Sequence, residues 1–107
     1  MEFECLDVDS IIGFEWDNAN IYKNRDKHGL DFKKIEEIFF NEPLIVVEDF
    51  LHSYNECRCI AYGRDDYNVK IMVVFTVREG LIRVISAREM TKKERAFYER
   101  NKNNPYI

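Results

Sequence analysis

The chain has 107 residues, of which 46% are hydrophobic and 14% aromatic, and its formal net charge is −4. This length fits one domain with a core of its own, and the apolar content argues against a disordered chain. A run of about 18 apolar residues is lacking, which argues against a transmembrane helix, and the acidic start MEFECLDVDS does not resemble a secretory signal.

The first predicted element is a strand over residues 11–16, IIGFEW. Alternating apolar residues are typical of a strand with one buried side. We therefore expect three side chains of this segment to face a core, namely Ile12, Phe14 and Trp16. Asp17 follows the strand and is placed to cap a helix.

Two helices are predicted next. The first spans about residues 18–28 and ends at Gly29, since glycine suits the left-handed residue that follows a helix. The second spans about residues 32–41, with Asp31 as its cap and Pro43 beyond its end. Its apolar stripe predicts a side that faces the core, made of Phe32, Ile35, Ile38 and Phe39.

The second half of the chain predicts four strands and a last helix. β-branched or alternating runs place the strands at residues 44–48, 57–63, 70–77 and 81–87. Thr91 and Glu94 form the capping-box pattern of a helix over about residues 92–102, with Ala96 and Phe97 against the sheet. The order β-α-α-β-β-β-β-α predicts an α+β fold in which helices flank an antiparallel sheet, because short connections join successive strands.

Charge is distributed unevenly along the chain. Residues 1–57 hold 5 Lys and Arg against 14 Asp and Glu, whereas residues 58–107 hold 11 against 6. This segregation predicts a basic working face, or an acidic face for a basic partner, unless folding mixes the two halves.

Three arginines lie in or at the ends of the predicted strands: Arg58, Arg83 and Arg88. A buried guanidinium is costly unless it is paired, so each one meets a carboxylate, emerges at a strand end or lines a face open to an anion. An ion pair of Arg58 with Glu48 or Glu56 is one alternative, and two-point contact with a phosphate is the other. Strand parity places Arg83 and Arg88 on opposite faces unless a bulge, a twist or the end of the strand intervenes.

The segment DKHG, residues 26–29, is a second candidate site. His28 can act as a general acid or base near neutral pH, and Lys27 can anchor a phosphate. The alternative is a plain helix C-terminus, where cations favour the helix dipole. His52 is far away in the sequence, so we do not expect a metal site.

The three cysteines, Cys5, Cys57 and Cys59, are an odd number that does not suit a disulfide framework. Their spacing offers too few ligands for zinc. We therefore expect reduced side chains, as in a cytoplasmic protein.

Spaced motifs run in order through residues 11–100. They are FEWD (14–17), N..KHG (24–29), F...E..F (32–39), Pro43, Glu48, E.R..A.G (56–63), VVFT (73–76), IRVISAR (82–88) and T..ER..YE (91–99). Together they resemble the BrnT family of type II toxin–antitoxin toxins. The resemblance implies a single toxin domain over residues 1–107, with an acidic leader at 1–10 and a BrnT-like core at 11–100. Asn18 stands where many relatives have proline.

The resemblance further implies a RelE/ParE-like fold and a cytoplasmic, metal-independent endoribonuclease that cleaves RNA through the 2′-hydroxyl and inhibits translation and growth. No cofactor is implied. The implied partner is a BrnA-like antitoxin, through which the complex would bind operator DNA. The candidate site residues are Arg58, Arg83 and Arg88 to grip the phosphate, Lys27 and His28 for binding or proton transfer, and Glu48 or Glu56 as a base or as an arginine holder. The alternatives are a non-cleaving toxin that poisons gyrase and a co-repressor component of the complex.

Overall fold

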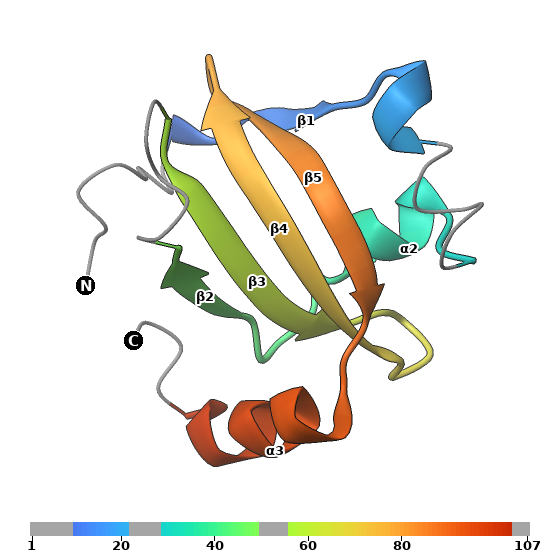
Figure 1. The fold of residues 1–107 in the computed structure, drawn as a ribbon, viewed down its shortest axis with the longest axis vertical. Coiled ribbons are helices and arrows are strands. Elements are labelled where there is room, and N and C mark those ends of the chain that lie inside the picture. The colour runs from blue at the N-terminus through green and yellow to red at the C-terminus, as the bar shows by residue number, and fades with distance from the viewer. Residues whose placement is uncertain (1–9, 22–28, 50–55, 104–107) are drawn as a thin grey trace.

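The computed structural model describes residues 10–21, 29–49 and 56–103. Its five-stranded sheet has the order β1-β5-β4-β3-β2 (Figure 1). The strands are β1 (Gly13–Glu15), β2 (Ile45–Glu48), β3 (Arg58–Arg64), β4 (Lys70–Arg78) and β5 (Leu81–Glu89). The labelled helices are α2 (Phe32–Glu37) and α3 (Lys92–Asn101), and residues 18–21 are also helical.

The strand directions confirm most of the predicted sheet and correct one part of it. β2, β3, β4 and β5 pair antiparallel in chain order, because each follows the last without a crossover helix. β1 pairs parallel with β5. The fold is therefore α+β with a mixed sheet, and the prediction of an antiparallel sheet was wrong for β1. Helices rather than a hairpin follow β1, so no tight turn sets its direction.

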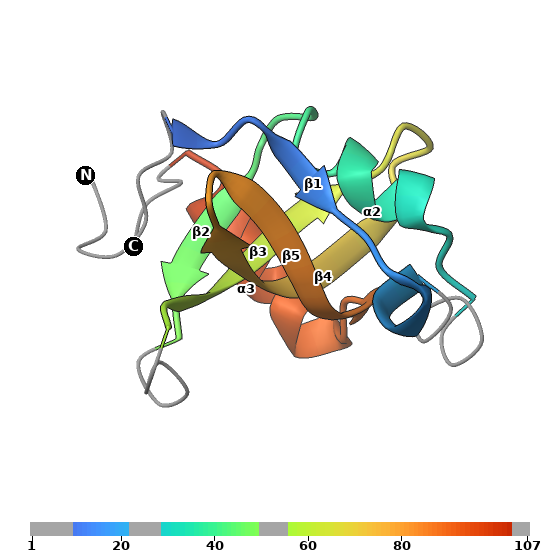
Figure 2. The ribbon, with the colours of Figure 1, turned by 90° about the horizontal axis from the view of Figure 1, so that it is seen from above.

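Helices α2 and α3 lie on opposite faces of the sheet (Figure 2). The α2 face holds one core cluster, which includes Ile35, Ile38, Val73, Phe75 and Val84. The α3 face holds another, made of Ile45, Met72, Met90 and Tyr98. Helix α3 lies across the end of the sheet where β5 finishes (Figure 1), so it covers only that end of this face.

Strand β1 and helix α2 lie where the sequence predicted them, but both are shorter than the predicted residues 11–16 and 32–41. The Asp31 side chain accepts a hydrogen bond from the Lys33 amide at 3.0 Å and caps α2, as predicted. Ile35 and Ile38 are fully buried, although the helix ends at Glu37. Ile12 is 80% exposed, so its predicted core position was wrong. It lies before β1 begins and beside the β4–β5 turn, beyond the end of the core.

Helix α3 begins at the predicted capping box. The Thr91 hydroxyl accepts from the Glu94 amide at 3.2 Å, and the Glu94 carboxylate accepts from the Thr91 amide at 2.8 Å. Phe97 packs against the sheet as predicted, and its ring lies 5.1 Å from that of Tyr62. Ala96 is exposed, which contradicts the prediction, because Phe97 and Tyr98 occupy the side of the helix that faces the sheet.

The cysteines differ from the expected reduced set. Cys57 is disulfide-bonded, to a partner outside the described residues. Cys59 is free and buried, and burial together with the nearby carboxylates of Glu48 and Asp49 raises its pKa to about 11. Of the two cysteines in the described part of the chain, one is therefore bonded and the other is a protonated core thiol. Within the described residues, no helix is long and apolar enough to cross a membrane.

Gly63 allows α2 and β3 to approach closely. A Cβ at this position would lie 3.0 Å from the Ile38 Cβ and 3.2 Å from the Ile38 carbonyl oxygen. We expect Gly63→Val to lower the free energy of unfolding by about 1–3 kcal/mol, because overpacking forces neighbouring atoms apart. Urea denaturation measures this loss. Gly13→Ala is the control, since its nearest contact would be an ordinary 3.5 Å, and equal losses in both variants would contradict the argument.

Candidate functional site

Side chains from four neighbouring strands form one row across the face that α3 partly covers. In register, Arg58 on β3 lies opposite Thr76 on β4, Thr76 lies opposite Arg83 on β5, and Arg83 lies opposite Glu15 on β1. Directly opposite residues point to the same face and lie about 5 Å apart. We call these four residues the arginine row. Thr76 at its centre is only 1% exposed, which leaves the long flanking side chains at the surface.

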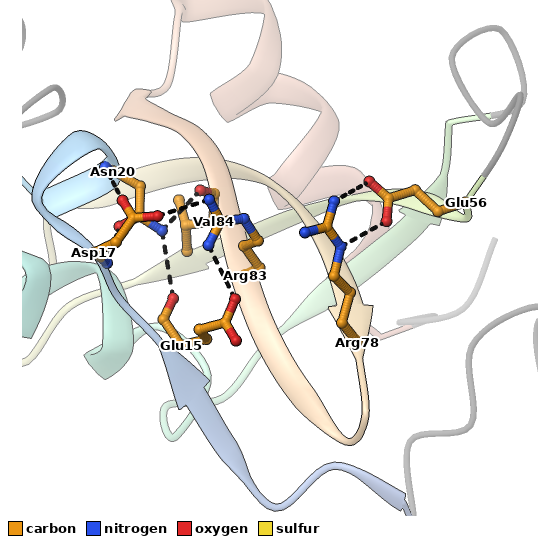
Figure 3. A network of polar contacts seen from close by, with 7 residues as sticks. All are labelled: Glu15, Asp17, Asn20, Glu56, Arg78, Arg83 and Val84. Atoms are coloured by element: carbon orange, nitrogen blue, oxygen red, sulfur yellow. Dashed lines mark hydrogen bonds and ion pairs between the residues drawn. The ribbon is translucent and has the colours of Figure 1, made fainter.

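A third arginine, Arg78, extends the row toward the β4–β5 turn. It lies two residues beyond Thr76 and so on the same face of β4. Its guanidinium forms a two-point ion pair with Glu56, with N–O distances of 2.8 and 3.0 Å (Figure 3). This hydrogen bonding lowers the pKa of Glu56, and the charges of Arg58 and Arg83 lower it further. All three guanidinium groups therefore act on one carboxylate.

Arg83 is held between two carboxylates. Its Nη1 donates to Glu15 at 2.9 Å and its Nη2 donates to Asp17 at 2.7 Å (Figure 3). Asp17 also accepts from the Asn20 amide at 2.9 Å, as expected of a helix cap. The bond from the Asn20 amide and the bond from Arg83 together lower the pKa of Asp17. One carboxylate thus joins the helix start to the arginine row.

Asn20 fixes this helix start to the sheet. Asn20 is buried, with 6% exposed. Its side-chain amide nitrogen donates to the backbone carbonyl oxygens of Glu15 at 3.3 Å and Val84 at 3.4 Å. The described helical residues 18–21 are therefore anchored at the arginine row. Lys27 and His28, which were predicted to serve in binding or proton transfer, lie outside the described residues.

The charged side chains at and beside the arginine row form a cluster that is open to solvent. The side chains of Arg78 and Arg83 are 53% and 27% exposed, and those of Glu15 and Asp17 are 42% and 44% exposed. Exposed ion pairs contribute little net stability. An incoming phosphate can therefore compete with the carboxylates for guanidinium groups that are already oriented.

A bulge in β5 decides where Arg88 points. The register passes from Phe75 opposite Val84 to Val74 opposite Ser86, which leaves Ile85 as an extra residue. An inserted residue shifts the alternation of side chains by one. Arg88 consequently shares a face with Arg83, which simple strand parity excluded.

Arg88 nevertheless lies at the other end of that face. It is opposite Met72, four residues along β4 from Thr76, which corresponds to roughly 13 Å at the usual rise per residue. Its guanidinium binds Glu94 of α3 at 2.6 and 3.0 Å. The structure thus brings Arg58, Arg83 and Glu56 together and places Arg88 beneath α3.

Glu48 lies on the opposite face from Arg58. In register it is opposite Cys59, which belongs to the α2-face core, and opposite residues share a face. The predicted alternative of an ion pair between Arg58 and Glu48 therefore does not fit the sheet. Glu56 does lie at the arginine row, where it binds Arg78.

Three residues of the cluster were missed from the sequence as site residues: Arg78, Glu15 and Asp17. Arg78 could have been found from the tight β4–β5 turn, in which Glu79 and Gly80 both have positive φ, 52° and 80°. A two-residue turn of this kind fixes the register of its hairpin. The pairing of Glu15 with Arg83 had no such signal, since it depends on the parallel β1. Within the described part of the chain, no group of three or more His, Cys, Asp or Glu side chains could hold a metal ion.

Comparison with known proteins agrees with the family resemblance. Residues 16–94 match the family model described as the ribonuclease toxin BrnT of type II toxin–antitoxin systems. The crystal structure of the Brucella abortus ribonuclease toxin BrnT is similar, with 26% sequence identity and a TM-score of 0.56 over 76% of this chain and 99% of that chain. No curated protein sequence matches the chain. Because the family model spans most of the sequence, the chain belongs to the BrnT family of ribonuclease toxins of type II toxin–antitoxin systems.

Proposed function

We propose that this protein is an endoribonuclease that cleaves RNA without a metal ion, with the neighbouring 2′-hydroxyl as the nucleophile. One observation carries the proposal. Arginines from three adjacent strands, Arg58, Arg78 and Arg83, gather at one end of an open sheet face. Family membership supports ribonuclease activity in general.

The chemistry requires charge stabilisation more than a generated nucleophile. The 2′-oxygen forms a bond to phosphorus while the bond from phosphorus to the 5′-oxygen breaks, and a pentavalent, doubly charged phosphorane lies between. Guanidinium groups fit two phosphate oxygens at once and favour this species over the less charged ground state. Glu15 and Asp17 hold Arg83 by both terminal nitrogens, so this donor is oriented before the substrate arrives.

Two proton transfers complete the reaction, one from the 2′-hydroxyl and one to the 5′-oxygen. We assign one of these to His28, because histidine titrates near neutral pH, and the other to Lys27, whose alternative role is to anchor the phosphate. Glu56 has a lowered pKa and binds Arg78, so it suits the role of arginine holder better than that of base. We assign Arg88 to stability, since its partner is the first turn of α3.

In the cell, this activity would inhibit translation and growth, and a BrnA-like antitoxin would neutralise it. The antitoxin would bind operator DNA, and the toxin would reach DNA only through it. We infer a cytoplasmic location for this module from its family and not from its cysteines, since Cys57 is bonded. We also infer a RelE/ParE-like fold for the toxin.

Cleavage of a defined RNA by the purified protein in excess EDTA tests the proposal. We expect full activity in EDTA and a product with a 2′,3′-cyclic phosphate, visible by mass spectrometry. A substrate with a single 2′-deoxy sugar at the cleavage position should resist cleavage there. Loss of activity in EDTA would reject metal independence, and cleavage of the deoxy substrate would reject the 2′-hydroxyl mechanism. Intact RNA with inhibited supercoiling by gyrase would favour the non-cleaving toxin.

A further inference from the structure

A second row of side chains lies beside the arginine row, on the same face of the sheet. In register, Val47 on β2 is opposite Ile60 on β3, and Ile60 is opposite Val74 on β4. We call these three residues the apolar row, which Ser86 of β5 ends because it is opposite Val74. Ile60 lies two residues from Arg58 along β3, so the two rows share a face and are about 7 Å apart.

The apolar row is partly exposed within the described part of the chain. Val47, Ile60 and Val74 are each only partly buried. In the next row along the strands, Ile45 and Met72 are buried where α3 packs on the sheet. Helix α3 therefore covers that next row more completely than the apolar row. Apolar side chains gathered at a surface are more typical of a contact site than scattered single residues are.

Surfaces of different character border the apolar row on its two sides. On one side lie the guanidinium groups of Arg58 and Arg83, which both act on the Glu56 carboxylate. On the other side, the partly buried ring of Tyr62 packs against Phe97 of α3 at 5.1 Å. A ligand that matches this order of surfaces joins an anionic group to a flat apolar group.

A nucleotide of single-stranded RNA has these two groups in the required order. Its phosphate is joined through the ribose to a planar base, and the spacing of the two rows is about the reach from a phosphate to its base. Single-stranded RNA-binding domains commonly hold unstacked bases on side chains of a sheet face. Three neighbouring strands span roughly 10 Å, which is wide enough for one base. An apolar protein segment would fit the apolar row but would bring no anion to the adjacent guanidinium groups.

We propose that the apolar row binds the base of a nucleotide whose phosphate lies on the arginine row, with Ile60 and Val74 in contact with the base. The proposal rests on the RNA substrate given under Proposed function and adds a base-binding site next to the cleaved bond. Packing against a base face does not read the base edges, so we expect this contact to strengthen binding without strict sequence preference.

The affinity of the full chain for two short single strands tests this proposal. One strand is a 2′-fluoro oligoadenylate, which has no 2′-hydroxyl and is not cleaved by the proposed mechanism. The other is an abasic chain with the same number of phosphates. Fluorescence anisotropy gives the dissociation constants of the wild type, Ile60→Ala and Val77→Ala. Val77→Ala is the matched control, because Val77 is also partly buried in the sheet but packs against the α2-face core.

We expect the wild type to bind the oligoadenylate about fivefold more tightly than the abasic chain, the lower end of what one stacked base contributes. Ile60→Ala should lose most of this preference and should bind the abasic chain as the wild type does. Such coupling between a side chain and a base is the result of a double-mutant cycle. A merely structural role of Ile60 would weaken the binding of both strands alike. Val77→Ala should bind both strands as the wild type does.

Equal affinity of the wild type for the two strands, or no binding of either, would overturn the proposal. Equal weakening of both strands by Ile60→Ala would also overturn it. If Ile60→Ala does not fold, Val74→Thr replaces it, because threonine keeps the branched shape that strands favour, and the same selective loss is expected. Weaker binding of the purified antitoxin by Ile60→Ala, with both strand affinities unchanged, would identify a protein segment as the occupant instead.

The base-binding site and the nuclease can fail independently. If the wild type cleaves RNA but Ile60→Ala shows no selective loss, the base-binding site is rejected and the nuclease is kept. If the selective loss occurs but the wild type cleaves no RNA, the nuclease is rejected and the base-binding site is kept.

Discussion

Replacing Arg83 with glutamine should slow RNA cleavage by about a hundredfold or more, the usual cost of losing one donor to a developing negative charge. Arg83 occupies the centre of the charge cluster, with Glu15 and Asp17 at 2.9 and 2.7 Å. Glutamine keeps part of the stem but has neither the charge nor the planar fork that binds two phosphate oxygens. Initial rates of cleavage of a defined RNA measure the loss, and growth arrest on expression should disappear with it.

The design must separate catalysis from folding. Arg83 is 27% exposed and its ion pairs are at the surface. We therefore expect the free energy of unfolding of the variant to differ from that of the wild type by less than about 1 kcal/mol. Arg100→Gln is the control, since Arg100 is an exposed arginine in the last turn of α3, away from the row. If a folded Arg83→Gln protein cleaved RNA at the wild-type rate, the arginine row would not be the active site.

Replacing Arg88 with glutamine should have a different effect, namely a loss of stability of about 1–2 kcal/mol. Charge-assisted hydrogen bonds contribute more to the free energy of unfolding than neutral ones do. We expect a value in the lower part of their usual range because the Arg88 side chain is 35% exposed. The two bonds to Glu94 join β5 to the capping box of α3. For a domain of this size, the change corresponds to a fall in melting temperature of several degrees.

The pH dependence of this loss identifies its cause. Burial by itself would raise the pKa of Glu94, but the hydrogen bonds from Arg88 and from the Thr91 amide outweigh it, and the pKa falls below the ordinary 4.5. A carboxylate with a lowered pKa stabilises the fold above its unfolded pKa, and this stabilisation is lost as the pH falls through the folded value. The difference in free energy of unfolding between the wild type and Arg88→Gln should therefore have its full value at pH 7 and decrease below about pH 4.5. A gap that is independent of pH would rule out this ion pair as the source.

The two arginine variants together distinguish two roles within one motif. IRVISAR contains both Arg83 and Arg88, and the sequence suggested that both grip the phosphate. If Arg88→Gln retained its fold but lost cleavage as severely as Arg83→Gln, the site would have to extend along β5 to α3. If folded Arg88→Gln and wild-type molecules cleaved RNA at the same rate, the active site would be confined to the arginine row.

Local sequence determined much of this protein. The cap residues Asp17 and Asp31, the capping box at Thr91 and the strands β2 to β5 were all predictable. Each depends on hydrogen bonds or alternation within a few residues of the chain. The ordered motifs also identified the family, because such spacing carries information that composition does not.

The tertiary structure alone decided which charged groups meet. One extra residue, Ile85, turned Arg88 onto the face of Arg83, and the parallel pairing of β1 brought Glu15 to Arg83 across 68 positions of sequence. Arg78 joined Glu56 through the register of β3 and β4. Such pairings depend on which strands lie side by side and in which register. These are properties of long-range packing, whereas propensity and spacing act only along the local chain.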